Sequence, residues 1–139
     1  MSEETVWQAP NISTNSIANL ILHLCGNIRQ YIISSLGHQK DIRQRDLEFT
    51  TIGGITKAAL LAKLQQTVTE AIHVLENISE EELLRQRMVQ GFYLSGISIM
   101  IHVTEHYSYH TGQIAYLTKL LTNKDLGFYA DRDLNILNN

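Results

Sequence analysis

The segment from residue 102 to residue 110 carries three histidines at intervals of four: His102, His106 and His110. Four residues are about one helical turn and ~6 Å of rise, so neighbouring members of the series lie on one side of a helix. Two neutral imidazoles one turn apart can bind a single metal ion at bond lengths of ~2.1 Å. The outer pair is separated by ~12 Å along the axis, so at most two adjacent histidines share an ion and any further protein ligand comes from elsewhere.

The apolar periodicity of the same segment favours one of the two pairs. Its apolar stripe consists of Ile99, Val103, Ile114, Leu117 and Leu121. At roughly 100° per residue, His110 lies ~10° from the centre of the stripe, His106 ~50° away at its border, and His102 ~90° away. Burying two imidazoles is unfavourable unless they are hydrogen-bonded or metal-bound. Two interpretations therefore stay open: core histidines paired with carbonyl or carboxylate groups, or a metal site.

Three long amphipathic helices are predicted to position these side chains. Apolar residues at three- and four-residue intervals place them at about 15–36, 56–77 and 95–121, with a short capped helix at about 80–86. The second helix is expected to face inward with Leu61, Leu64, Val68, Ala71, Ile72 and Leu75. This pattern predicts an all-α bundle in a single domain spanning 1–139.

The segments between the helices are less regular. Residues 1–14 and the charged connector 38–54 are predicted to be irregular, and 87–94 are ambiguous, with little support for strands. Gly127 predicts a turn, and at most one short helix is expected after it.

Composition narrows the classes of function. The net charge of −3 and the lack of basic clusters argue against nucleic-acid binding. No apolar run reaches the ~18 residues of a membrane helix, and the acidic first ten residues do not resemble a signal peptide. The single cysteine, Cys25, cannot form an internal disulfide and is expected to be a small core residue. These features predict a cytoplasmic protein.

Three segments, NSIANLILHLCGNIRQYI, RQRDLEF and HVTEHYSYHTGQIAYLTK, occur in this order between about Trp7 and Tyr129. Together they resemble the DinB/YfiT-like superfamily, and more narrowly a branch with an HLxGN helix and an HxxxHxGQI helix. The resemblance implies a four-helix bundle in which three histidines, here His23, His106 and His110, hold a divalent metal. The residue pattern alone places His23 ~120° from the main stripe of its helix, as a surface or second-face residue.

Relatives usually carry a further helix before the tryptophan-containing segment. Here the chain starts just ahead of Trp7, so the bundle is expected to lack its usual first helix. An incomplete bundle exposes apolar surface, which usually marks an interface. We therefore expect a homodimer, or docking of residues 130–139, to cover the gap.

Three neutral histidines leave a metal with open positions for water or substrate, as in catalytic sites. Zn and Ni suit this donor set best, and Fe or Mn fit as well. The wider superfamily includes metal-dependent transferases of low-molecular-weight thiols such as bacillithiol or mycothiol. The resemblance thus implies thiol transfer to a small-molecule electrophile, in detoxification. The alternatives are a non-catalytic metal-binding stress protein and a metal-dependent hydrolase.

Four further side chains are candidates for the pocket or for supporting the ligands. Asn27 lies one helical turn from His23, and Gln113 lies one turn from His110. Tyr109 directly precedes His110. His102 sits one turn before the ligand pair, where relatives often carry histidine. Arg43 and Arg45 could bind an anionic group of a thiol cofactor, although a solvated, salt-bridged loop is the favoured interpretation.

Overall fold

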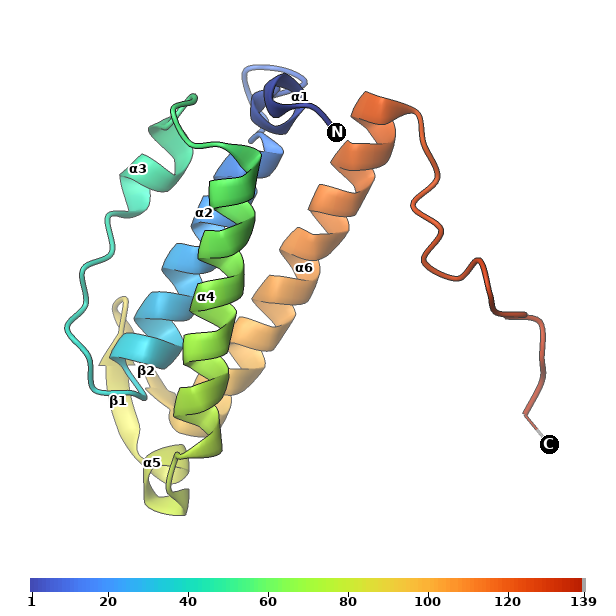
Figure 1. Cartoon of the computed structure of the whole chain (residues 1–139). Helices are drawn as coiled ribbons and strands as arrows, with labels where there is room; N and C mark the ends of the chain where they lie inside the picture. The colour runs from blue at the N-terminus through green and yellow to red at the C-terminus, as the bar shows by residue number, and fades with distance from the viewer. Residues whose placement is uncertain (139) are drawn as a thin grey trace.

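The computed structural model describes residues 1–138, and three long helices form its body (Figure 1). They are α2 (Ile17–Ile28), continued by the π-helical segment η1 (Arg29–Ser34), α4 (Lys57–Glu76) and α6 (Gly96–Thr122). Each begins after a hydroxyl side chain, Ser16, Thr56 or Ser95, that accepts a hydrogen bond from the backbone N–H three residues later. Such caps satisfy N–H groups that have no partner in the first turn. The three predicted helices are confirmed, apart from the π-helical end of the first.

The helix α2 packs against both α4 and α6, and it lies behind α4 in the view of Figure 1. The helices α4 and α6 scarcely meet each other in the described part of the chain. The fourth corner of the bundle, opposite α2, therefore carries no helix among residues 1–138. This arrangement confirms the predicted helical bundle that lacks one helix.

An apolar groove with a volume of about 400 Å³ marks the vacant corner. It is lined by Ile28, Ile32, Val68, Ala71, Ile72, Leu75, Met100, Val103, Thr104, Tyr107 and Ser108. Ile72 on α4 is 50% exposed and Leu61 is 62% exposed, so the prediction that both face inward is wrong. Ile72 lines the groove, so a further element at this corner would cover it.

Because α2 is central, its buried residues do not form a single stripe. Buried side chains on α2 include Ile17, Leu20, Leu22, His23, Leu24, Asn27 and Ile28. A helix that is covered on several sides hides polar residues as well as apolar ones. His23 is 7% exposed, so of the two positions left open by the angular arithmetic the surface is excluded and a second buried face is the one observed.

Short elements occupy the segments between the long helices. They are α1 (Glu3–Trp7), α3 (Arg45–Thr50) and α5 (Glu80–Leu84). The first two lie in segments that were expected to be irregular, and α5 confirms the short capped helix. The expected short helix after Gly127 is absent from the described residues 123–138, which run away from the bundle (Figure 1).

The ambiguous segment forms an antiparallel hairpin of β1 (Gln86–Val89) and β2 (Phe92–Ser95). Gln90 and Gly91 both have positive φ, 51° and 84°, as the tight turns of two-residue hairpins require. The segment left ambiguous by the sequence, where strands had little support, is therefore a hairpin.

Two clusters of buried apolar side chains lie toward opposite ends of the bundle. One centres on Tyr31, Ile32 and Ile99 near the hairpin, and the other on Ile17 and Leu60 near α1. The histidines of α2 and α6 lie along these helices between the two clusters. In residues 1–138 no helix is long and apolar enough to span a bilayer.

Candidate metal centre

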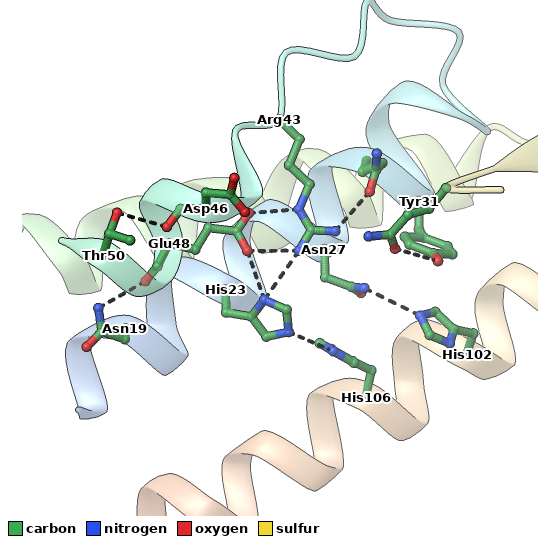
Figure 2. A network of polar contacts seen from close by, with 12 residues as sticks. Asn19, His23, Asn27, Tyr31, Arg43, Asp46, Glu48, Thr50, His102 and His106 are labelled. Atoms are coloured by element: carbon green, nitrogen blue, oxygen red, sulfur yellow. Dashed lines mark hydrogen bonds and ion pairs between the residues drawn. The ribbon is translucent and has the colours of Figure 1, made fainter. Parts of the chain in front are cut away.

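His23 of α2 and two histidines of α6, His106 and His110, face one another across the gap between these helices. One ring nitrogen from each lies within 4.8 Å of the others. The Nε2 atoms of His23 and His106 are 3.0 Å apart (Figure 2). The ring of His110 has its centroid 4.9 Å from that of His23 and 4.4 Å from that of His106. The structure thus brings together the three residues that the resemblance implied as ligands.

The second ring nitrogen of His23 is held by a buried carboxylate. Its Nδ1 lies 2.8 Å from Oε2 of Glu48, which is 7% exposed (Figure 2). A carboxylate that accepts the Nδ1 proton fixes the tautomer in which Nε2 carries the free lone pair. That lone pair then points toward His106, which is the orientation a metal ligand needs.

The carboxylate of Glu48 is itself held by Arg43. The Nε and Nη2 atoms of Arg43 donate to Oε1 and Oε2 at 2.7 and 2.8 Å, a two-point ion pair with a side chain only 3% exposed. Burial raises the pKa of Glu48, but the hydrogen bonds from Arg43 and His23 outweigh it and lower the pKa below its usual range. Glu48 is therefore ionised at neutral pH. Arg43 is fully engaged here and is not free to bind a cofactor anion.

Space for this carboxylate comes from Gly26 in the HLCGN segment. A Cβ atom at this position would overlap the carboxyl group of Glu48. Two turns earlier, the side-chain amide of Asn19 donates to the carbonyls of Glu48 and Thr51 at 3.0 and 2.8 Å. The surface of α2 is thus shaped to seat α3 and to direct Glu48 onto His23.

The two histidines of α6 are held less firmly. Nδ1 of His110 lies 2.6 Å from Oε1 of Gln113, whose amide nitrogen donates to the hydroxyl of Tyr109 at 3.2 Å. Nδ1 of His106 is buried and has no hydrogen-bond partner among the described residues. Gln113 and Tyr109, both predicted pocket or supporting residues, therefore act through His110.

The surroundings of all three histidines of α6 favour the neutral form of the imidazole ring. Burial, together with the nearby rings of His110, His23 and His102 and the charge of Arg43, lowers the pKa of His106 to about 4. Burial also lowers the pKa of His110 and of His102. Neutral imidazole is the form that binds metals. Two Nε2 atoms facing each other at 3.0 Å need a shared proton or a cation between them, so the donor set fits a divalent ion.

His102 does not join the cluster. Its ring stacks on Tyr31, with centroids 4.4 Å apart, and its Nε2 lies 3.4 Å from the amide nitrogen of Asn27 (Figure 2). The ring centroid of His102 is 5.6 Å from that of His106. His102 and Asn27 therefore form a neighbouring polar pair between α2 and α6, in keeping with a supporting role rather than ligation.

Two pockets adjoin the cluster. One, of about 530 Å³, lies along α6 and is lined by Ser13, Thr14, Asn15, Leu20, Tyr109, Gly112, Gln113, Tyr116 and Leu117. Gln113 connects this pocket to His110. The other, of about 310 Å³, lies behind Glu48 and includes Cys25, a buried thiol whose pKa is raised by burial. Neither pocket is lined by a histidine of the cluster, and the first reaches the cluster only through Gln113 and Tyr109, which contact His110.

Sequence reasoning missed Glu48 and treated Arg43 as a solvated loop residue. Both come from the connector between α2 and α4, where no periodicity marks buried positions. The available signal was the glutamate of RQRDLEF, a segment that already contributed to the resemblance.

Comparison with known proteins supports the fold. A family model described as "Protein of unknown function (DUF1572)" matches residues 1–130. Among solved structures, the crystal structure of a DinB-like protein, YjoA, from Bacillus subtilis matches with a TM-score of 0.68 at 17% identity. The match covers 92% of this chain and 83% of that chain. No curated protein shows a significant match.

Proposed function

Because the chain belongs to the DUF1572 family of the DinB-like superfamily, we propose that it binds one divalent metal ion through His23, His106 and His110. The observation that carries the proposal is the convergence of three ring nitrogens within 4.8 Å, one of them oriented by a buried carboxylate. Three imidazoles suit Zn or Ni best, and Fe or Mn also fit.

The donor set leaves room for a further ligand, because only three protein groups converge. A bound ion would supply Lewis acidity and lower the pKa of a coordinated thiol or water. Around it, Glu48 holds the proton on Nδ1 of His23 and Gln113 holds the one on Nδ1 of His110. Both interactions keep Nε2 of the ligand directed inward.

For the reaction, we infer transfer of a low-molecular-weight thiol to a small-molecule electrophile, as a cytoplasmic detoxification activity. A pocket of about 530 Å³ next to His110 is large enough for a small substrate. The hydroxyl of Tyr109 and the amide of Gln113 line it and can orient a polar group. A thiolate is a far better nucleophile than a thiol, so a site that favours the deprotonated form promotes such a transfer.

Elemental analysis of untagged, dialysed protein tests the metal site. The wild type is expected to retain about one divalent ion per chain, and His106→Ala is expected to lose it, because two imidazoles alone bind much more weakly. His73→Ala is the matched control, since His73 is exposed on α4 far from the cluster. Equal metal content in the wild type and His106→Ala would refute the site.

The reaction is tested separately with metal-loaded protein. One set of assays combines a panel of small thiols with electrophiles, and the other offers ester and amide substrates. Thiol consumption that disappears in His106→Ala supports the transferase. Turnover of esters or amides alone would indicate the hydrolase, and no turnover with the metal still bound would indicate a non-catalytic binding protein.

A further inference from the structure

The pocket of about 530 Å³ next to His110 is uncharged. None of the described residues that line it carries a charge, and they offer only hydroxyl, amide, apolar and aromatic groups. The pocket behind Glu48, by contrast, includes the cations Arg29, Arg43 and Lys63. An ion that left water for the uncharged pocket would meet no opposite charge, and burying an unpaired charge is costly. The pocket next to His110 therefore suits an uncharged molecule.

The lining of this pocket includes a glycine that the helix itself does not require. Gly112 lies inside α6, where glycine destabilises a helix relative to alanine. It is exposed, and no atom lies within 4 Å of the position that a Cβ would take. Because Gly112 lines the pocket, a side chain here would take up part of its volume. Glycine allows a ligand to approach the backbone closely, so Gly112 keeps the pocket open at the surface of the helix.

Two tyrosines flank this glycine. Tyr109 and Tyr116 are seven residues apart, so they project in nearly the same direction from α6, about 10 Å apart along its axis, with Gly112 between them. Both line the pocket, and they are 63% and 68% exposed. A flat ring that lies on the backbone at Gly112 would contact both phenol rings, and such aromatic contacts stabilise a complex. The arrangement therefore favours a planar, aromatic ligand.

Both phenol hydroxyl groups have a hydrogen atom to donate to a ligand. The hydroxyl of Tyr109 accepts a hydrogen bond from the amide of Gln113 at 3.2 Å, and its own hydrogen has no acceptor among residues 1–138. The hydroxyl of Tyr116 makes no hydrogen bond within the same residues. A tyrosine hydroxyl can donate one hydrogen bond. The pocket therefore offers two donors to a ligand that carries acceptor oxygens.

We propose that this pocket binds uncharged, electron-poor aromatic molecules that carry nitro or carbonyl groups, and that Tyr109, Gly112 and Tyr116 determine this specificity. Such molecules would be the electrophiles of the reaction proposed above, and their role in that reaction rests on the proposed function. Nitro and carbonyl groups withdraw electrons from a ring and make it reactive toward a thiolate. The same groups are the hydrogen-bond acceptors that the two phenols would bind.

Tyr109 also connects the pocket to the candidate metal centre. Its ring meets that of His110 edge-on, with centroids 4.9 Å apart. Gln113, which donates to the hydroxyl of Tyr109, lies 2.6 Å from Nδ1 of His110. A molecule bound by Tyr109 would thus be separated by one side chain from a proposed metal ligand.

Titration of the full-length protein with 1,3-dinitrobenzene tests the proposal. This probe is uncharged and has no leaving group, so it reports binding without reaction and needs neither metal nor thiol. Changes in the NMR chemical shifts of backbone amides are expected to centre on residues 109–117. The probe 3,5-dinitrobenzoate, which adds a negative charge to the same ring, should bind about tenfold more weakly or worse, because the lining offers no cation.

Variants of the lining separate binding from folding. Gly112→Leu is expected to raise the Kd for 1,3-dinitrobenzene by about tenfold or more, since the new side chain fills the space above the backbone. Leucine favours a helix over glycine, so the unfolding temperature should not fall. Tyr109→Phe and Tyr116→Phe should each raise the Kd about two- to tenfold through the loss of one hydrogen bond. Tyr93→Phe, an exposed change on β2 outside the pocket, is the matched control.

The outcomes distinguish this site from the reaction. No binding of 1,3-dinitrobenzene up to its solubility limit would overturn the proposal. So would a Kd that Gly112→Leu leaves unchanged, or equal affinity for 3,5-dinitrobenzoate. Binding that shows the expected effects, in a metal-loaded protein that transfers no thiol to reactive nitroarenes, would support the site and refute the proposed reaction instead.

Discussion

On α2 the ring of His23 is fixed from behind by Glu48, whereas on α6 the ring of His106 has no partner at Nδ1 and His110 has a single neutral one. The α2 side also contains a charged side chain, Arg43, whose function is to hold Glu48. The comparison shows that one ligand is oriented before any ion arrives, while the pair on α6 depends mainly on helical spacing. Disturbing the α2 side should therefore cost stability as well as affinity.

The largest effect is expected from Arg43→Met. This change leaves the carboxylate of Glu48 buried without its cation, which typically costs about 3–5 kcal/mol of unfolding free energy. Urea denaturation measures the loss. Arg45→Met, which removes only a contact between the guanidinium and the ring of Phe49, should cost less than about 1 kcal/mol. Equal losses for the two variants would mean that the α2 side is not held by its ion pair.

Gly26→Ala should have the next largest effect. The new methyl group would overlap the carboxyl group of Glu48, and overpacking of this kind costs about 1–3 kcal/mol. Displacing Glu48 should also weaken metal binding by about 10–100-fold. Chelator competition and urea denaturation measure the two effects. Gly112→Ala on α6, where no atom lies within 4 Å of the added methyl group, should instead stabilise the fold by up to about 1 kcal/mol. A similar loss of stability in both variants would contradict this difference between the two helices.

Acid should destabilise the metal-free protein through the α6 side. The pKa of His106 is lowered to about 4 in the fold, against ~6.5 in the unfolded chain. As the pH falls below ~6.5 the unfolded chain takes up a proton first, so folding stability is lost on going from pH 7 to pH 5. Allowing for solvent screening, we expect about 1–2 kcal/mol. His106→Gln should reduce this slope, and an unchanged slope would contradict the assignment.

The smallest effect is expected from Gln113→Ala. It removes the one acceptor at Nδ1 of His110, so metal affinity should fall by up to about tenfold with little change in folding stability. Glu48→Gln, the matched change on the α2 side, should weaken binding more. If Gln113→Ala weakened metal binding more than Glu48→Gln, the ligand on α6 rather than the ligand on α2 would be the one that depends most on its hydrogen-bond partner.

Sequence reasoning could identify the pair on α6 because His106 and His110 belong to one helix, where spacing alone determines proximity. It could not place His23 by pattern, since α2 is buried on several sides and no single stripe describes it. The resemblance supplied that residue instead. Glu48 stayed unrecognised because its contact with His23 joins residues 25 positions apart, through a connector in which the short helix α3 was not predicted. The hairpin was not predicted because its two strands have only four residues each, too few for a clear alternation of apolar and polar residues.

The connector that carries Glu48 and Arg43 has a kinetic consequence. Short peripheral segments such as this one, with a single six-residue helix, open more readily than the long helices they link. Opening of residues 38–54 would withdraw the carboxylate from His23 while α2, α4 and α6 stay folded. The rate at which an ion leaves the site would then follow the fluctuation of this connector, and occupancy would be visible as slower amide hydrogen exchange along it.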